Sequence, residues 1–109
     1  MDLNEIQQLI RDGRYEFSFH AQQERLEENL DVKEIEDAVV GHGEILEEYP
    51  NDPRGESCLI LGFAGTHPIH VVVGWATRKR DGQDVLRVVT VYSPTLPKWT
   101  DPRTRGGRP

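Results

Sequence analysis

The chain has 109 residues, of which 13 are Lys or Arg and 19 are Asp or Glu, giving a formal charge of −6. This length predicts one domain, and the single cysteine, Cys58, excludes an internal disulfide and a zinc site built from several thiolates. The longest apolar runs, 59–65 and 71–76, are too short to span a bilayer, and the first residues lack the pattern of a signal peptide. We therefore expect a cytoplasmic protein with no membrane association.

Helix signals dominate the first half of the sequence. Asp2 and Asp31 are each followed three residues later by a glutamate, the pattern of a capping box that opens a helix. Between them, alternating aromatic and polar residues predict a short strand, and strong helix formers follow it. The expected elements are a helix that ends at Gly13, a strand over Tyr15–Phe19, a helix over His20–Asn29 and a helix from Asp31 that is stopped by Gly41 and Gly43.

The second half changes to apolar and β-branched runs separated by strong turn signals. The short connections leave no room for crossover helices, so the runs predict an antiparallel meander. We expect an α+β fold of two layers, with the N-terminal helices on one face of a four-stranded or five-stranded sheet. The four predicted strands are Ile45–Tyr49, Cys58–Phe63, Ile69–Thr77 and Val85–Tyr92.

After Ser93 the composition becomes rich in proline and arginine. We expect a domain over residues 1–93 and a tail over 94–109 that forms neither a strand nor a long helix. The tail is expected to lie along the surface or to be disordered at its end, and Trp99 is its one predicted anchor.

Charge is distributed unevenly along the chain. Residues 1–50 hold 14 acids against 4 bases, whereas residues 51–109 hold 5 acids against 9 bases. The acids fit the solvated faces of helices, and the basic half could face a polyanion such as RNA. Both interpretations stay open at this point.

His20 is the first candidate for chemistry. It is predicted in the first turn of a helix, where Ser18 occupies the N-cap position, and Glu24 lies on the same helix face. Arg25 is on an adjoining stripe, so a base, an acid and a cation could act together on a phosphodiester. The alternative is a histidine that only bonds a neighbouring loop, with solvated Glu24 and Arg25 beside it.

His70 is the second candidate. It lies in an apolar strand, where a buried polar group must find a partner. Thr90 and Tyr92 share a face of the last predicted strand and could be those partners. His70 and Tyr92 could form a proton-transfer pair, or His70 could be a satisfied histidine of the core.

The sequence gives little support for a metal or another cofactor. His67 and His70 are three residues apart on or near a strand and would point to opposite sides, and no HExxH or paired CxxC motif occurs. Cys58 lies in an apolar run and is expected to be an inert core residue. We therefore expect neither a metal nor another cofactor.

Several short motifs resemble the bacterial family of domains of unknown function numbered 4258. They are Phe17-Ser18 with His20-Ala21 and Arg25, Tyr49-Pro50, Ile69-His70 with the three valines that follow, and Thr90-Val91-Tyr92 with Pro94. The resemblance covers residues 15–95, and the family is similar to RelE/ParE-like and BrnT-like toxins. The resemblance therefore implies a RelE-like fold, metal-independent RNA cleavage, and a small antitoxin-like protein as partner.

The resemblance also implies roles for five residues. His20 or His70 would transfer protons, Arg25 would stabilise the charge on the phosphorane, and Tyr92 would orient the substrate or act as an acid. Thr90 falls on the threonine of the same family motif. The alternative function is a non-catalytic protein-interaction domain.

Overall fold

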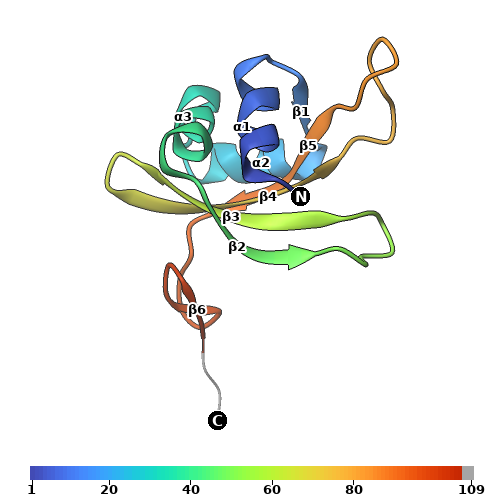
Figure 1. Ribbon diagram of the computed structural model, residues 1–109. Coiled ribbons are helices and arrows are strands. Elements are labelled where there is room, and N and C mark those ends of the chain that lie inside the picture. Colours follow the sequence, from blue (N-terminus) through green and yellow to red (C-terminus); the bar gives the residue numbers. More distant parts are fainter. Residues whose placement is uncertain (107–109) are drawn as a thin grey trace.

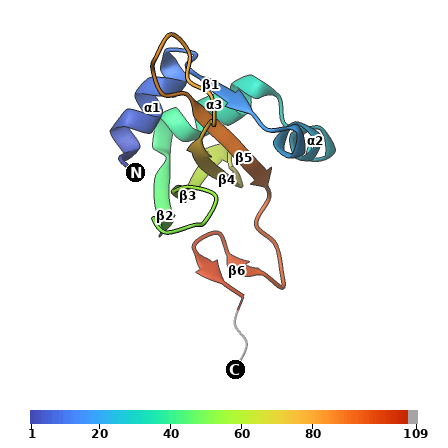
Figure 2. The same cartoon turned by 90° about the vertical axis from the view of Figure 1, so that its right-hand side faces the viewer.

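The computed structural model of the protein describes residues 1–106. A five-stranded sheet with the order β1-β5-β4-β3-β2 forms its middle layer. Helices α1 (Leu3–Arg11) and α3 (Val32–His42) cover one face of the sheet, and α2 (Phe19–Glu27) runs beside β5 (Figures 1 and 2). A separate hairpin, β6–β7, lies against the opposite face, which we call the lower face. The predicted α+β class, with helices on one face of a sheet, is confirmed.

The strands of the second half form the predicted meander. β2 (Glu44–Tyr49), β3 (Ser57–Ala64), β4 (His67–Trp75) and β5 (Leu86–Tyr92) are antiparallel neighbours in chain order. β1 (Tyr15–Phe17) adds a fifth strand, but it pairs with β5 in parallel, so the expectation of a wholly antiparallel sheet is wrong here. β1 and β5 are joined through most of the chain, and no tight turn between them imposes the antiparallel direction.

The capping signals locate the helix starts. The Asp31 side chain accepts a hydrogen bond from the Glu34 N–H, and the Glu34 side chain accepts one from the Asp31 N–H, which completes a capping box. Ser18 caps α2, so the strand before it ends at Phe17. Phe19, expected on a half-buried strand, is instead the first residue of α2 and 77 % exposed.

The hydrophobic core lies between the helices and the upper face of the sheet. It contains Ile6 and Ile10 of α1, Ala38 and Val39 of α3, and the strand residues Cys58, Ile60, Val71, Val73 and Val88. Cys58 is fully buried, which confirms the predicted core position, and burial raises the pKa of its thiol to about 11. None of the helices among residues 1–106 combines the length and apolar character that a membrane crossing requires.

Gly62 sets the distance between α3 and β3, because a Cβ at this position would lie 2.5 Å from the carbonyl oxygen of Ala38. We expect Gly62→Ala to lower the free energy of unfolding by about 2 kcal/mol, since the backbone of α3 must shift away from the sheet. Urea unfolding of the two proteins measures this difference. Gly41→Ala is the matched control, because a Cβ at Gly41 meets nothing within 4 Å. An equal effect of both substitutions would contradict the packing argument.

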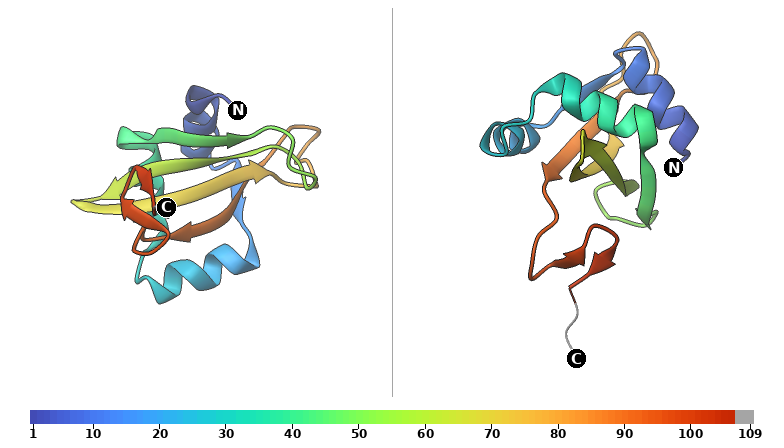
Figure 3. Two further views of the ribbon diagram at one scale, coloured as in Figure 1. Left: turned by 90° about the horizontal axis from the view of Figure 1, so that it is seen from below. Right: turned by 90° about the vertical axis from the view of Figure 1, so that its left-hand side faces the viewer.

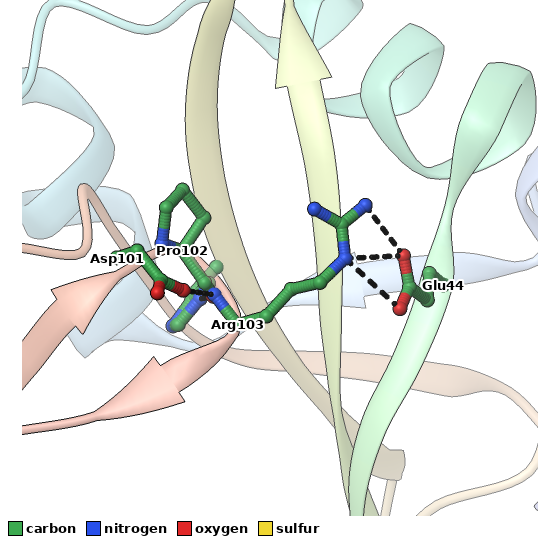
Figure 4. Close-up of polar contacts among 5 residues, drawn as sticks. Glu44, Asp101, Pro102 and Arg103 are labelled. Carbon is green, nitrogen blue, oxygen red and sulfur yellow. Dashed lines mark hydrogen bonds and ion pairs between the residues drawn. The ribbon is translucent and has the colours of Figure 1, made fainter.

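The C-terminal segment forms a hairpin on the lower face. β6 (Trp99–Asp101) and β7 (Thr104–Arg105) pair with each other, so the expectation of a tail without strands is wrong. Pro102 lies in the turn, where no ladder hydrogen bond is required. The Asp101 side chain closes this turn by accepting the N–H of Arg103 at 2.8 Å (Figure 4). Trp99 is 2 % exposed, which confirms it as the anchor, and residues 107–109 lie outside the described residues.

Candidate functional site

Ser18 fixes the position of α2 against β5. Its hydroxyl accepts the N–H of Ala21 at 3.0 Å and donates to the carbonyl of Val89 at 2.9 Å. Its own N–H bonds the carbonyl of Val88 at 2.9 Å. The first turn of α2, which carries His20, is therefore held beside β5 just beyond the end of β1 (Figure 3).

Glu24 connects His20 to β5. One Glu24 carboxylate oxygen lies 3.2 Å from Nε2 of His20, and the other accepts the Thr90 hydroxyl and the Val91 N–H, the latter at 3.0 Å. The Val91 N–H lies on the edge of β5 that β1 leaves unpaired, so Glu24 satisfies this edge as well as orienting the histidine. The side chain of His20 is 67 % exposed and that of Glu24 is 21 % exposed. The arrangement is an accessible imidazole held by a fixed carboxylate.

Arg25 does not join this group. Its Nε donates to the Gln22 side chain at 2.6 Å, its Nη1 donates to the carbonyl of Leu30 at 3.2 Å, and its guanidinium lies over the Phe17 ring. These contacts tie Arg25 to the end of α2 and the loop after it. Another cation is needed if a phosphate is bound beside His20.

His70 lies on the lower face of β4, fully buried under the hairpin. Its Nε2 is 2.7 Å from the carbonyl oxygen of Pro102, and its Nδ1 is 3.1 Å from the Tyr92 hydroxyl. A carbonyl only accepts, so Nε2 carries the proton, and Tyr92 donates to Nδ1 of the neutral ring. Burial lowers the pKa of His70, which favours this neutral form. In this structure His70 is therefore a buried histidine with a hydrogen-bond partner at each ring nitrogen.

The five predicted residues thus fall into two neighbouring groups and one outlier. Thr90 is paired with Val72, and Tyr92 is paired with His70, in the β4–β5 ladder. Residues two apart on a strand share a face at about 7 Å. The group of His20 and Thr90 therefore adjoins the group of His70 and Tyr92, in which His70 is fully buried and Tyr92 is partly buried. His67 belongs to neither group, because its Nε2 lies 2.7 Å from the Ser93 hydroxyl.

Two ion pairs and the buried ring of Trp99 hold the hairpin against the lower face. Arg103 makes three contacts with the Glu44 carboxylate, at 2.9, 3.2 and 3.3 Å, and Figure 4 shows its guanidinium reaching across β3 to β2. Arg105 binds Glu47 at 2.6 and 2.9 Å, and this contact lowers the pKa of the Glu47 carboxyl. Trp99 stacks edge-on against His70 with the ring centroids 4.3 Å apart.

The indole N–H of Trp99 is buried without a hydrogen-bond partner among residues 1–106. A buried donor left unpaired costs about 1–3 kcal/mol. This cost partly offsets the stabilisation that burial of the indole ring contributes to the docked hairpin.

A cavity of about 420 Å³ opens on the uncovered part of the lower face. Its floor includes Val72, Gly74 and Val89, and Arg54 and Arg87 contribute guanidinium groups to its lining. Arg87 is paired with Glu16 at 2.8 Å and is 38 % exposed. None of the five predicted residues lines this cavity, whose lining comes mainly from β2, β3, β4, β5 and the turn between β2 and β3.

The sequence matches a family described as "Domain of unknown function (DUF4258)" over residues 17–93. The chain belongs to this family. The match includes His20, His70, Thr90 and Tyr92, whereas the β6–β7 hairpin lies beyond its end. No curated protein and no solved structure matches the chain. The DUF4258 family description names no activity, so the similarity to RelE-like toxins stays a prediction.

Proposed function

We propose that this DUF4258 protein is a toxin-like ribonuclease that cleaves RNA without a metal, with His20 as its proton-transfer group. The observation that carries the proposal is the exposed imidazole of His20, held at 3.2 Å by a carboxylate that β5 fixes in turn. A surface histidine with an oriented carboxylate behind it is the usual arrangement of a general base.

The proposal gives the two nitrogens of His20 different roles. Nε2 faces Glu24, 3.2 Å from one carboxylate oxygen, and the proposal takes Nδ1 as the nitrogen that accepts a proton. In the proposed reaction Nδ1 takes the proton of a ribose 2′-OH, and the 2′-oxygen attacks the adjacent phosphorus. The bond to the 5′-oxygen breaks, and the imidazolium returns the proton to this leaving oxygen. Glu24 stabilises the imidazolium between the two transfers.

The proposed phosphate-binding cation is Arg87, which a phosphate would have to take from Glu16, its partner at 2.8 Å. Arg87 lies on β5 next to Val88 and Val89, the two residues whose carbonyls bond Ser18 at the start of α2. The guanidinium of Arg87 is half-exposed on the wall of the cavity and paired with Glu16, whereas that of Arg25 donates to the Leu30 carbonyl inside the turn after α2. Arg87 thus replaces Arg25 as the proposed stabiliser of phosphorane charge.

The experiment incubates the purified chain with a mixed-sequence single-stranded RNA in excess EDTA. We expect fragments ending in a 2′,3′-cyclic phosphate, and no cleavage of DNA of the same sequence, because DNA lacks the 2′-OH. Expression in bacterial cells without any partner is expected to arrest growth and degrade total RNA. Intact RNA together with normal growth, from a folded and well-expressed protein, would overturn the proposal.

A second candidate function, a protein-interaction domain, is favoured by the outer side of α2. Phe19 is 77 % exposed and Leu26 is 63 % exposed, and residues seven apart lie on the same side of a helix. A small antitoxin-like protein could cover this side. In that case Phe19→Ser with Leu26→Ser removes partner binding, whereas His20→Ala leaves it unchanged.

A further inference from the structure

The β6–β7 hairpin can leave the lower face without breaking the main sheet. Its two strands form a sheet of their own and share no ladder with β1–β5 (Figure 3). Among residues 1–106, the polar and aromatic contacts that tie it to the body of the protein are those of Trp99, Pro102, Arg103 and Arg105. An isolated two-stranded hairpin is marginally stable by itself, so its position depends on these contacts.

The docked hairpin closes off one part of the proposed site. His70 is fully buried because Trp99 and Pro102 lie on it, although it stands on a strand face away from the hydrophobic core. Tyr92, two residues from Thr90, is partly buried and bonds His70 at the edge of this cover. Release of the hairpin would therefore extend the open surface from His20 and Thr90 to the His70–Tyr92 pair.

The two arginines that hold the hairpin are accessible to competing anions. The side chains of Arg103 and Arg105 are 56 % and 57 % exposed. In each pair, the arginine Nε and Nη2 donate to both oxygens of one carboxylate, that of Glu44 or of Glu47 on β2. A phosphodiester presents the same pair of oxygens that a guanidinium recognises in a carboxylate. A strand of phosphates can therefore compete with Glu44 and Glu47 for these arginines, and neighbouring phosphates can occupy both at once.

We propose that the β6–β7 hairpin is an autoinhibitory cover that single-stranded nucleic acid releases by taking Arg103 and Arg105 from Glu44 and Glu47. The released hairpin carries its arginines to the phosphate backbone, and the uncovered face presents His70 and Tyr92. Release also frees the indole N–H of Trp99 from a position where it has no partner among the described residues. The choice of nucleic acid as the releasing polyanion rests on the proposed function. Release of the hairpin itself does not require that RNA is cleaved.

Chymotrypsin cleavage after Trp99 in the full chain measures release, because the docked residue is buried and the released one is accessible. The probe is a short oligodeoxythymidylate, which has no 2′-OH and cannot react by the proposed mechanism. We expect it to raise the cleavage rate at Trp99 at least about tenfold, with other sites unchanged. This test therefore measures release of the hairpin separately from RNA cleavage, and a protein that cleaves no RNA can still give a positive result.

Variants separate the ion pairs from general destabilisation. Glu44→Gln with Glu47→Gln is expected to speed cleavage at Trp99 without the oligonucleotide. Arg103→Ala with Arg105→Ala is expected to do the same and to lose the response to the oligonucleotide. Lys33→Ala is the matched control, because it breaks the exposed pair with Asp37 on α3, and it should behave as the wild type.

Three outcomes would overturn the inference. The first is a Trp99 site that stays protected both with the oligonucleotide and in the glutamine variant, which would mean a fixed hairpin. The second is a parallel increase at sites in the core strands, which would mean global unfolding. The third is equal stimulation by inorganic polyphosphate at matched charge, which would remove nucleic acid as the specific releasing ligand.

Discussion

Replacing His20 with alanine is expected to reduce RNA cleavage at least about 100-fold, the usual contribution of a positioned general base. The side chain is 67 % exposed and its one ion pair is to Glu24, so the variant should unfold at the same denaturant concentration as the wild type. Loss of activity with unchanged stability is the combination that separates a catalytic histidine from a structural one. Initial rates on single-stranded RNA and urea unfolding curves measure the two quantities.

Two further variants make this result specific. Glu24→Gln keeps an oxygen that can accept from Thr90 and Val91 but removes the charge beside His20, so we expect about a tenfold loss of rate with little change in fold. His42→Ala is the matched control, because His42 is an exposed histidine at the end of α3. Equal rates for His20→Ala and the wild type would refute His20 as the base and favour the interaction domain.

The local parts of this fold could be predicted from the sequence because their causes are local. A capping box, a glycine stop and the alternation of a strand each act within a few residues. Asp31 with Glu34 therefore marked the start of α3, and the turn signals between apolar runs marked the four meander strands. The same reasoning placed Val71 and Val73 on the face opposite His70, and the core confirms it.

The features that could not be predicted depend on contacts between distant segments. The parallel direction of β1 depends on its pairing with β5, which is distant in sequence. Arg80, in the loop between β4 and β5, donates to the carbonyls of Gly13 and Tyr15 and so holds the start of β1 in place. The hairpin has no sequence signal of its own, because its two strands contain only five residues and Pro102 lies in the turn between them. Its place depends on Glu44 and Glu47, more than 50 residues earlier in the chain.

The candidate site shows the same division. The spacing of four residues placed His20 beside Glu24, because helix geometry guarantees this contact. That Glu24 also binds Thr90 and Val91 is a property of how α2 lies against β5, and no local rule contains it. The helix position of Arg25 predicts a cation near His20, yet its guanidinium donates to the carbonyl of Leu30 instead.

Replacing His70 with alanine is expected to lower the free energy of unfolding by about 3 kcal/mol. The substitution leaves the Tyr92 hydroxyl and the Pro102 carbonyl without their partner and opens a gap under Trp99. Urea unfolding at pH 8 measures the effect. The matched control is His67→Ala on the same strand, which is exposed and should cost less than about 1 kcal/mol. Equal costs for the two histidines would contradict the buried network.

His70 also predicts a dependence of stability on pH. Burial lowers the pKa of His70 in the folded chain below the value of about 6.5 found in unfolded chains, so the unfolded chain binds the additional proton first. Stability is therefore fully present above pH 6.5 and falls as the pH decreases towards the folded-state pKa, by up to about 1.4 kcal/mol per pH unit from this residue.

His70→Gln isolates this effect, because glutamine supplies one donor and one acceptor but does not titrate. The difference in unfolding free energy between the wild type and His70→Gln should shrink as the pH falls from 7.5 to 5.5, while the contributions of carboxylates cancel in the comparison. A difference that stays constant over this range would mean that His70 titrates equally in both states. Because the hairpin is what buries His70, the same pH series in Arg103→Ala with Arg105→Ala should show a smaller slope, which connects the titration to closure of the lower face.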